Sequence, residues 1–339
     1  MHDRRFFTGG YATEGSICLW EFQESEGRLK KLEAVSGFKN PSYLILSNDR
    51  MNLYAVSELE DRGEVLAFAL DNGAIPRFIN RLPIKGKAAC HLAVKDRLLV
   101  TANYLRGSLS VLSLDKNGGL NEVISEPDHK QPGREDVQAH AHYVMFLDES
   151  DRLLAADLGL DKVFVYRVDH QKQSLTEVED EGISFPQGSG PRHLVRHPGR
   201  SDLLYVVCEL SSQVYTVRIG ENPQILQCLS TLPENCDAQN STAAIKMSRD
   251  GRFLYASNRG YDGIAVFRVG DAGTLQVAGI VKTRGICPRD FDLFDSFAVV
   301  AYQDSGALEV FEIDADTGLL KETGITAEAA APVCVCPLR

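Results

Sequence analysis

Histidine, arginine and carboxylate side chains recur at equivalent places along this 339-residue chain, within short phrases about fifty residues apart. His91, His142 and His193 lie in three successive phrases, and Arg192 and Arg289 share one position in two phrases. A neutral imidazole or a carboxylate can take a proton from water. The planar guanidinium of arginine binds phosphate or carboxylate groups through parallel hydrogen bonds. Brought together, such residues would form a site for a small anionic ligand, with groups beside it that can transfer protons.

The phrases that carry these residues share one pattern: a Pro or small residue, two variable positions, then an apolar strand. They begin at residues 41, 89, 141, 191, 242, 288 and 332. After each of the first six come a second apolar strand, an alternating third strand, and a glycine-containing turn with a weak fourth strand. This period is typical of a four-stranded β unit repeated around a ring. We therefore predict an all-β fold, a seven-bladed β-propeller with four-stranded antiparallel blades.

The two ends of the chain predict how this ring closes. Residues 16–22 align with residues 263–269, a third strand, so the N-terminus enters in the middle of a repeat. Residues 332–338 supply only a first strand. Joined, the two fragments make one complete blade shared by both termini, which secures the ring. No Pro/Gly/Ser-rich linker divides the chain, so residues 1–339 are expected to form one domain.

Composition narrows the class of protein. The 47 acidic against 36 basic residues give a net charge of −11, which argues against a nucleic-acid partner. The sequence has no apolar run near eighteen residues and no apolar core of a signal peptide at residues 1–8, so we expect a cytoplasmic protein without a membrane partner. The eight cysteines form no CxxC pair, which favours free thiols over disulfides.

In a propeller the innermost strand of every blade begins at the same end of the central channel, so the variable positions of the seven phrases converge there. The ends of the second strands are expected near the same rim. The candidate site residues on this rim are Glu58, His91, His140, His142, Asp157, Arg192, His193, Glu209, Arg259, Arg289 and Asp290.

Each of these residues also has an ordinary structural interpretation. A single arginine after a proline is usually solvated, a single buried histidine is most often structural, and Asp157 or Glu209 could cap a turn through backbone N–H groups. Convergence of so many titratable groups favours a functional site, because a channel mouth would otherwise hold unpaired charge.

Several longer motifs resemble one known family. They are residues 139–142, 156–163, 188–193, 209–214, 250–260 and 288–291. Together they resemble the seven-bladed β-propeller lactonases, the cycloisomerase 2 type of 6-phosphogluconolactonase. The resemblance implies hydrolysis of 6-phospho-D-glucono-1,5-lactone in the pentose phosphate pathway, with no metal or other cofactor. The chain departs from the family at Ala244-Ile245-Lys246, where an Asp-Ile-His run is common, and at Ala89, where a proline often stands.

Lactone hydrolysis needs a base for water, donors for the oxyanion and an acid for the leaving ring oxygen. We expect His193, oriented by Glu209, to be the base; Asp157 or Glu58 is the alternative, with histidines such as His142 then donating hydrogen bonds. The arginines are expected to hold the anionic group of a small lactone: Arg192, Arg259 and Arg289. Asp290, His91 and His140 complete the expected substrate-binding set. We expect a monomer or weak homo-oligomer.

Three other interpretations remain open. A carboxymuconate-type lactonising or cycloisomerising enzyme would use the same arginines. A metal-dependent lactonase would need His91, His142 and His193 to converge with a carboxylate, although their sequence spacing has no local ligand pattern. A non-catalytic propeller could serve as a protein-binding platform, as WD-repeat rings do, but the Trp-Asp dipeptides are absent.

Overall fold

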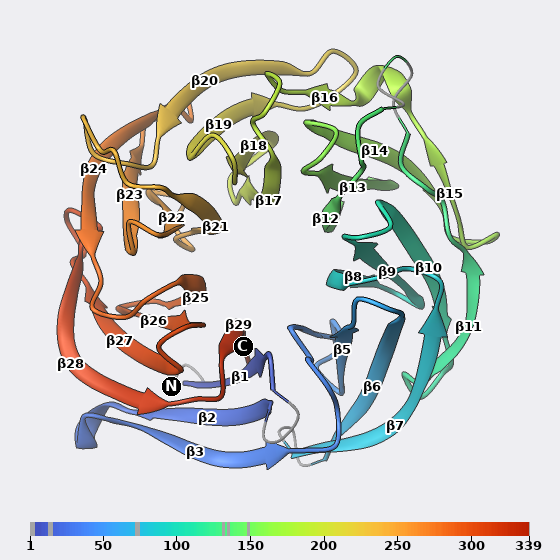
Figure 1. The fold of residues 1–339 in the computed structure, drawn as a ribbon, viewed down its shortest axis with the longest axis horizontal. Coiled ribbons are helices and arrows are strands. Elements are labelled where there is room, and N and C mark those ends of the chain that lie inside the picture. The colour runs from blue at the N-terminus through green and yellow to red at the C-terminus, as the bar shows by residue number, and fades with distance from the viewer. Residues whose placement is uncertain are drawn as a thin grey trace.

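The computed structural model describes residues 4–12, 16–71, 75–130, 133, 136–147 and 150–338. The chain forms a ring of seven antiparallel sheets around a central channel (Figure 1). This confirms the seven-bladed propeller predicted from the fifty-residue repeat. The strands run from the channel outward in each blade, so the residues that face the channel come from one strand per blade.

The innermost strands carry the seven phrases. They are β4 (Tyr43–Leu46), β8 (Ala89–Lys95), β12 (Ala141–Leu147), β17 (Pro191–His197), β21 (Ser241–Met247), β25 (Pro288–Phe294) and β29 (Pro332–Pro337). The second strands are β5 (Asn52–Glu58), β9 (Leu98–Asn103), β13 (Arg152–Asp157), β18 (Arg200–Cys208), β22 (Phe253–Arg259), β26 (Phe297–Tyr302) and β1 (Arg5–Gly10). Below, a blade is named by its innermost strand.

The third and outer strands complete each sheet. The third strands are β6 (Gly63–Asp71), β10 (Ser108–Leu114), β14 (Lys162–Asp169), β19 (Gln213–Arg218), β23 (Gly263–Val269), β27 (Ala307–Ile313) and β2 (Ile17–Gln23). The outer strands are β7 (Ile75–Ile84), β11 (Leu120–Ser125), β15 (Ser174–Glu177), β20 (Gln224–Ser230), β24 (Leu275–Lys282), β28 (Leu320–Glu328) and β3 (Arg28–Val35). A short strand, β16 (Ile183–Ser184), also pairs with β14, and two single-turn 3₁₀ helices span Glu24–Glu26 and Glu179–Glu181.

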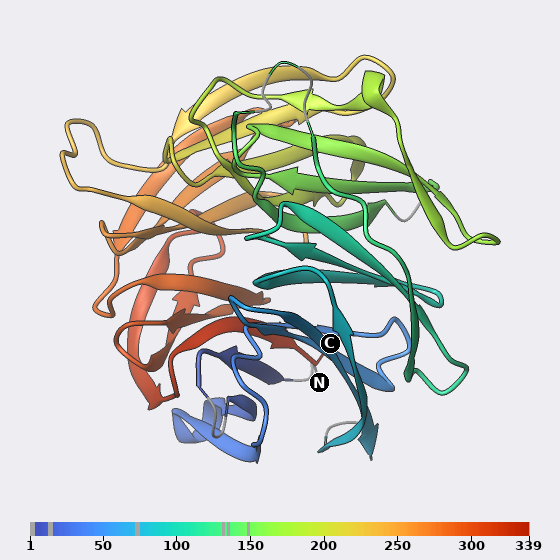
Figure 2. The same ribbon diagram turned by 45° about the vertical axis from the view of Figure 1, so that its right-hand side comes forward.

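One blade contains both ends of the chain, as the alignment of residues 16–22 predicted. Its strand order is β29-β1-β2-β3, with Phe7 opposite Cys336 and Thr8 opposite Val335. The first and last described strands lie side by side in Figures 1 and 2. Pairing the two ends of the chain supplies β29 with a partner strand and completes the four strands of this blade.

Apolar layers between neighbouring blades hold the ring together, and tyrosines on the second strands add a recurring tie. Tyr54, Tyr205 and Tyr255 each donate a hydrogen bond of 2.8–2.9 Å to a glycine carbonyl in a turn of the next blade. All three glycines, Gly118, Gly273 and Gly318, have positive φ (+81°, +80° and +75°), a conformation that favours glycine. Each tie therefore fixes one blade against the next.

A β-bulge interrupts the start of six of the innermost strands. In β8, β12, β17, β25 and β29 the register shifts between the first and third residues, and in β21 it shifts between Thr242 and Ile245. Strict alternation would send the second and third residues to opposite faces of the sheet. The extra residue in a bulge re-aims a side chain, so both positions can reach the channel mouth.

No described helix has the length and apolar character needed to span a membrane.

All eight cysteines are free thiols, and five of them are buried.

Candidate functional site

A small cavity lies at the end of the channel where the innermost strands begin. Its lining combines residues of six blades: Tyr11, Ser42, Tyr43, Glu58, Cys90, His142, Arg192, His193, Arg289 and Val333. Its volume is about 10 Å³, close to the minimum for a single water molecule. Five of the predicted site residues therefore meet in one place, around a space of about the size of one reacting oxygen.

On one side of the cavity, the lining residue Arg192 shares a carboxylate with a second arginine, Arg259. Arg192 donates from Nε to Oε2 of Glu209 (2.8 Å), and Arg259 Nη2 lies 2.8 Å from the same oxygen. Arg192 also donates to the carbonyl of Ala243 (2.8 Å). Burial opposes ionisation of Glu209, but the surrounding arginines outweigh it and lower the pKa of this carboxyl. Burial and the neighbouring cation Arg259 lower the pKa of Arg192 to about 10.

The opposite side is a chain of three groups that the sequence alone did not single out as a unit. Arg289 donates from Nη2 to the hydroxyl of Tyr11 (2.9 Å), and that hydroxyl donates to Oε2 of Glu58 (2.9 Å). Burial raises the pKa of Tyr11 well above its usual range, so the phenol keeps its proton. The phenol therefore links the cation and the carboxylate while holding both at the cavity wall.

The charge balance of this group favours an anion. Three guanidinium groups, Arg192, Arg259 and Arg289, face two carboxylates, Glu58 and Glu209. Neutral histidines add no charge, so one positive charge remains uncompensated within the group. A phosphate or carboxylate at the mouth would complete the pairing, through the bidentate geometry that arginine offers.

The histidines of the rim are neutral. Burial, followed by the field of Arg192 and other cations, holds the pKa of His142 and of His193 well below the usual range. Nη1 of Arg192 donates to Nε2 of His193 (3.1 Å), so this nitrogen is the acceptor and the ring proton is on Nδ1. His193 is therefore better suited to donate a hydrogen bond than to accept a proton from water. Glu209, which we expected to orient His193, instead binds Arg192.

A cluster of aromatic rings packs against the cavity lining. His91 lies between Tyr43 and Tyr143 in tilted contact, with ring centroids 4.0 and 3.8 Å away, and His193 packs 4.8 Å from Tyr143. Nδ1 of His91 accepts the backbone N–H of Val144 (3.3 Å) in the next blade. Burial, with Lys246 and Arg192, lowers the pKa of His91 well below its usual range. His91 thus packs behind Tyr43, a residue of the cavity lining, and helps to hold its ring in place.

The departure from the family motif forms a second charged cluster, in the channel wall. Lys246 Nζ lies 3.5 Å from Oδ1 of Asp290 and 3.3 Å from Oδ2 of Asp292. Burial lowers the pKa of Lys246, but the two carboxylates outweigh it and raise the pKa above the usual range, so the ammonium is retained. Asp290 also accepts the backbone N–H of Val335 (2.8 Å) in the closing blade. Asp290 therefore joins two blades rather than lining the cavity.

Six of the eleven predicted site residues are not part of the cavity lining, and two of these, Asp157 and His140, also lie apart from the arginine and lysine clusters. Asp157 accepts Nδ1 of His129 (2.7 Å), with both side chains fully buried, and the backbone N–H groups of His140 and Leu160. The ring of His140 stacks on Tyr104 (4.4 Å) at the adjacent loop. Asp157 thus has the turn-bonding role that was the alternative to a catalytic one.

Sequence reasoning missed Tyr11 and did not treat Tyr43 and Tyr143 as site residues. Tyr43 and Tyr143 occupy the third position of their phrases, the same position as His91 and His193, so that position carried the signal. Tyr11 follows the second strand of the closing blade, the position equivalent to Arg259 or Glu58 in theirs. Its phrase was too divergent from the other repeats to indicate this.

Within the described ranges, no three His, Cys, Asp or Glu side chains are grouped so that they could hold a metal ion. His142 and His193 have ring centroids 5.3 Å apart, and His91 and His193 5.7 Å. The three imidazoles predicted as possible metal ligands are therefore neighbours without a carboxylate that completes a ligand set.

Comparison with known proteins gives one consistent result. The family model for "Lactonase, 7-bladed beta-propeller" matches residues 5–337. The 6-phosphogluconolactonase of Bacillus subtilis is 34% identical over 97% of this chain and 97% of its own. A crystal structure of a Lactobacillus plantarum protein has 30% identity and a TM-score of 0.88, covering 98% of each chain. The periplasmic gluconolactonase PpgL of Pseudomonas aeruginosa has 27% identity and a TM-score of 0.90, also over 98% of each chain.

Proposed function

The chain belongs to the lactonase family of seven-bladed β-propellers, and from this premise we propose that it hydrolyses 6-phospho-D-glucono-1,5-lactone to 6-phosphogluconate. The proposal places the protein in the pentose phosphate pathway and in the cytoplasm. The observation that carries it is the group of three arginines and two carboxylates around the cavity at the channel mouth. Its uncompensated positive charge suits a phosphorylated substrate, and the full-length similarity to a 6-phosphogluconolactonase supports the reaction type.

Glu58 is the base that this geometry favours. Its carboxylate lines the cavity and is held by the hydroxyl of Tyr11, whereas the accepting nitrogen of His193 is already bonded to Arg192. In the proposed step Glu58 takes a proton from water while the water oxygen bonds to the lactone carbonyl carbon. The bond from that carbon to the ring oxygen then breaks, and the proton passes to the ring oxygen as it leaves.

The oxyanion formed at the carbonyl needs fixed donors. The guanidinium of Arg192 and the ring N–H groups of neutral His193 and His142 are the candidates, because all three side chains line the cavity. Arg289 has one side-chain hydrogen bond within the described part of the chain, to Tyr11, and offers its remaining N–H groups to the phosphate. The cavity has room for about one oxygen atom, either the carbonyl oxygen or the attacking water, so the phosphate must lie outside it.

The test measures proton release at constant pH from freshly prepared 6-phospho-D-glucono-1,5-lactone, with the spontaneous rate subtracted. The same assay with glucono-1,5-lactone, which lacks the phosphate, measures how much the phosphate contributes. We expect the natural chain to exceed the spontaneous rate and to prefer the phosphorylated lactone. Arg289→Ala should raise KM for the phosphorylated lactone roughly tenfold or more, with a smaller effect on the unphosphorylated one.

The same assay separates the alternatives. Rates equal to the spontaneous rate on both lactones would refute the proposal. Turnover of a carboxymuconate lactone alone would instead favour the lactonising or cycloisomerising enzyme. A stable protein partner together with no turnover on any lactone would favour a binding platform.

A further inference from the structure

A second cavity, of about 600 Å³, lies at the opposite end of the central channel. The innermost strands β21 and β25 begin at the candidate site and end at this cavity. Met247, at the end of β21, and Leu293, near the end of β25, line it. The turns that follow these strands and Arg50, in the turn between β4 and β5, complete the opening. This cavity lies in the size range of small-molecule sites and is independent of the proposed lactone site.

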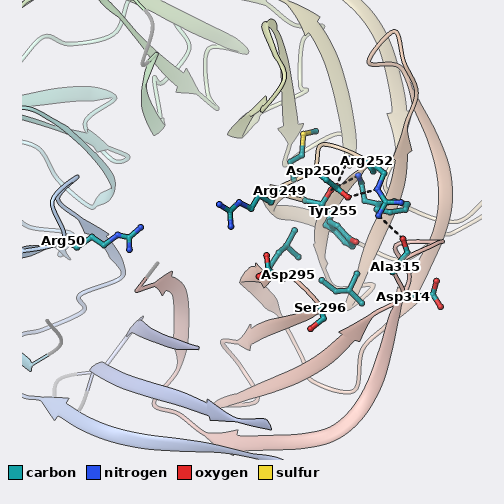
Figure 3. A pocket seen from close by; sticks show the side chains of 14 residues that line it. Arg50, Arg249, Asp250, Arg252, Tyr255, Asp295, Ser296, Asp314 and Ala315 are labelled. Carbon is teal, nitrogen blue, oxygen red and sulfur yellow. Dashed lines mark hydrogen bonds and ion pairs between the residues drawn. The ribbon is translucent and has the colours of Figure 1, made fainter. Parts of the chain in front are cut away.

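Two arginines face each other across this cavity. Figure 3 shows Arg50 and Arg249 pointing toward one another from opposite sides of the opening. Neither guanidinium has a hydrogen bond or ion pair with any part of the chain that the structure describes. Arg252, on the same lining, already has partners within the chain. It donates hydrogen bonds to the carboxylate of Asp250 (2.6 Å) and to the carbonyl of Ala315 (3.1 Å). Arg50 and Arg249 are both exposed, and their mutual repulsion across the opening would be relieved by an anion bound between them.

The turns that present these arginines are fixed by the same bonds in both blades. Ser47 donates to Oδ1 of Asp49 (2.6 Å), and Ser248 donates to Oδ1 of Asp250 (2.7 Å). Each aspartate also accepts a backbone N–H two residues later. The acidic side chains next to the two arginines are therefore occupied within their own turns, and both guanidinium groups are left for a ligand.

The remaining lining is mixed. Met247, Leu293 and Ile313 provide an apolar wall between the two blades. Ser296 on the same lining can bond to a hydroxyl group of a ligand, and the neighbouring Asp295 disfavours a second negative charge near it. The cavity thus combines two convergent cations with an apolar surface beside them.

We propose that this cavity is a second ligand site, which binds a phosphate monoester with its phosphoryl group between Arg50 and Arg249 and its organic part against the apolar wall. A phosphoryl group presents three oxygens in different directions, so guanidinium groups from two sides can both bind it. A carboxylate has only two oxygens, which lie in one plane, and it carries a single negative charge, so it can fill the space between two opposed guanidinium groups less completely. A phosphate monoester therefore fits two opposed arginines better than a carboxylic acid does.

Calorimetric titration of the natural chain with phenyl phosphate, and with benzoate for comparison, tests this site. We expect binding of phenyl phosphate to weaken at least tenfold in Arg50→Gln/Arg249→Gln and to persist in Arg289→Ala, where any binding at the candidate lactone site is impaired. Arg218→Gln, a change at an exposed arginine on β19, is the matched control and should bind as the natural chain does. Thermal unfolding of each variant shows whether it remains folded.

Three results would overturn the proposal. They are no binding of phenyl phosphate to the natural chain, unchanged binding in the double variant, and benzoate binding as tightly as phenyl phosphate. Loss of binding in Arg289→Ala alone would assign the phosphate to the lactone site instead. Since the readout is binding, failure of lactone turnover leaves this test intact.

Discussion

Three neutral buried histidines make the stability of this propeller pH-dependent near neutrality. Burial and nearby cations hold the pKa of His91, His142 and His193 well below the usual range in the folded chain. In the unfolded chain each imidazole titrates near pH 6.5. As pH falls below about 6.5, the unfolded state binds protons that the folded state does not, so the free energy of unfolding decreases.

The magnitude follows from linkage. A single histidine that stays neutral in the folded state loses about 1.4 kcal/mol of stabilisation between pH 7.5 and pH 5.5. Three such groups lose about 4 kcal/mol, a large part of the 5–15 kcal/mol that is typical of folded proteins. The carboxylates contribute at lower pH: the pKa of Glu209 is lowered by its arginine neighbours, so its contribution is present above about pH 4.3 and is lost only as pH falls further.

Urea unfolding at pH 7.5, 6.5 and 5.5 measures this loss, and NMR titration of the imidazole C2 protons assigns it to individual histidines. His193→Gln should remove about a third of the pH dependence of the free energy of unfolding. This holds even if the substitution also changes the stability at every pH by a constant amount. His170→Gln is the matched control, because His170 is partly exposed and pairs with Asp96 and Asp151 at the surface. Titration of the three rim histidines near pH 6.5 in the folded protein, or an unchanged pH dependence in His193→Gln, would refute the reasoning.

Three further substitutions test separate parts of the structure. Lys246→Met should lower stability by about 3–5 kcal/mol, because it leaves the buried carboxylate of Asp290 without its cation; an unchanged urea midpoint would show that the cluster is not stabilising. Asp157→Asn should destabilise the fold by about 1–3 kcal/mol, because it weakens the hydrogen bond to His129, and should leave KM for the lactone unchanged. A lower kcat in the folded variant would instead show that Asp157 takes part in catalysis. Tyr11→Phe should lower kcat/KM about tenfold to a hundredfold, since it removes the hydroxyl between Glu58 and Arg289; kinetics equal to those of the natural chain would contradict that link.

The repeat of about fifty residues was sufficient to predict the ring, the seven innermost strands and the shared closing blade. Each blade is formed by consecutive strands joined by short turns, and the neighbouring blade buries its apolar face. A repeated strand pattern in the sequence is therefore sufficient to predict most of the fold. The apolar runs at residues 98–103 and 297–302 of the sequence coincide with the second strands β9 (Leu98–Asn103) and β26 (Phe297–Tyr302). Others differ at their ends, as β18 does by starting at Arg200.

The site was predictable only as a group. Ring closure brings Arg192, His193, Glu209 and Arg289 to one mouth, as their equivalent positions in the repeats indicated. Individual bonds were not predictable, because they depend on β-bulges and side-chain directions that leave no mark on the repeat pattern. The bond from Arg192 to His193 occupies the nitrogen that a base would need.

Other pairings were hidden for a similar reason. His129 reaches Asp157 from a loop, so no repeat position connects the two residues. Lys246 stands where the family motif commonly has a histidine, and the sequence alone showed only this difference. In the structure its ammonium forms ion pairs with Asp290 and Asp292 of the next blade. In each case the partner is set by contacts between segments distant in the sequence, and a motif within one segment cannot reveal it.

The central claim is that the side chains gathered at the start of the innermost strands open a lactone with Glu58 as the base. The most direct test is the initial rate of proton release from fresh 6-phospho-D-glucono-1,5-lactone with the natural chain, with Glu58→Gln and with the surface control Arg218→Gln. The account predicts a rate well above the spontaneous one for the natural chain and the control, and a kcat lower by about 10²–10⁴ in Glu58→Gln. Equal rates for the natural chain and Glu58→Gln would contradict it.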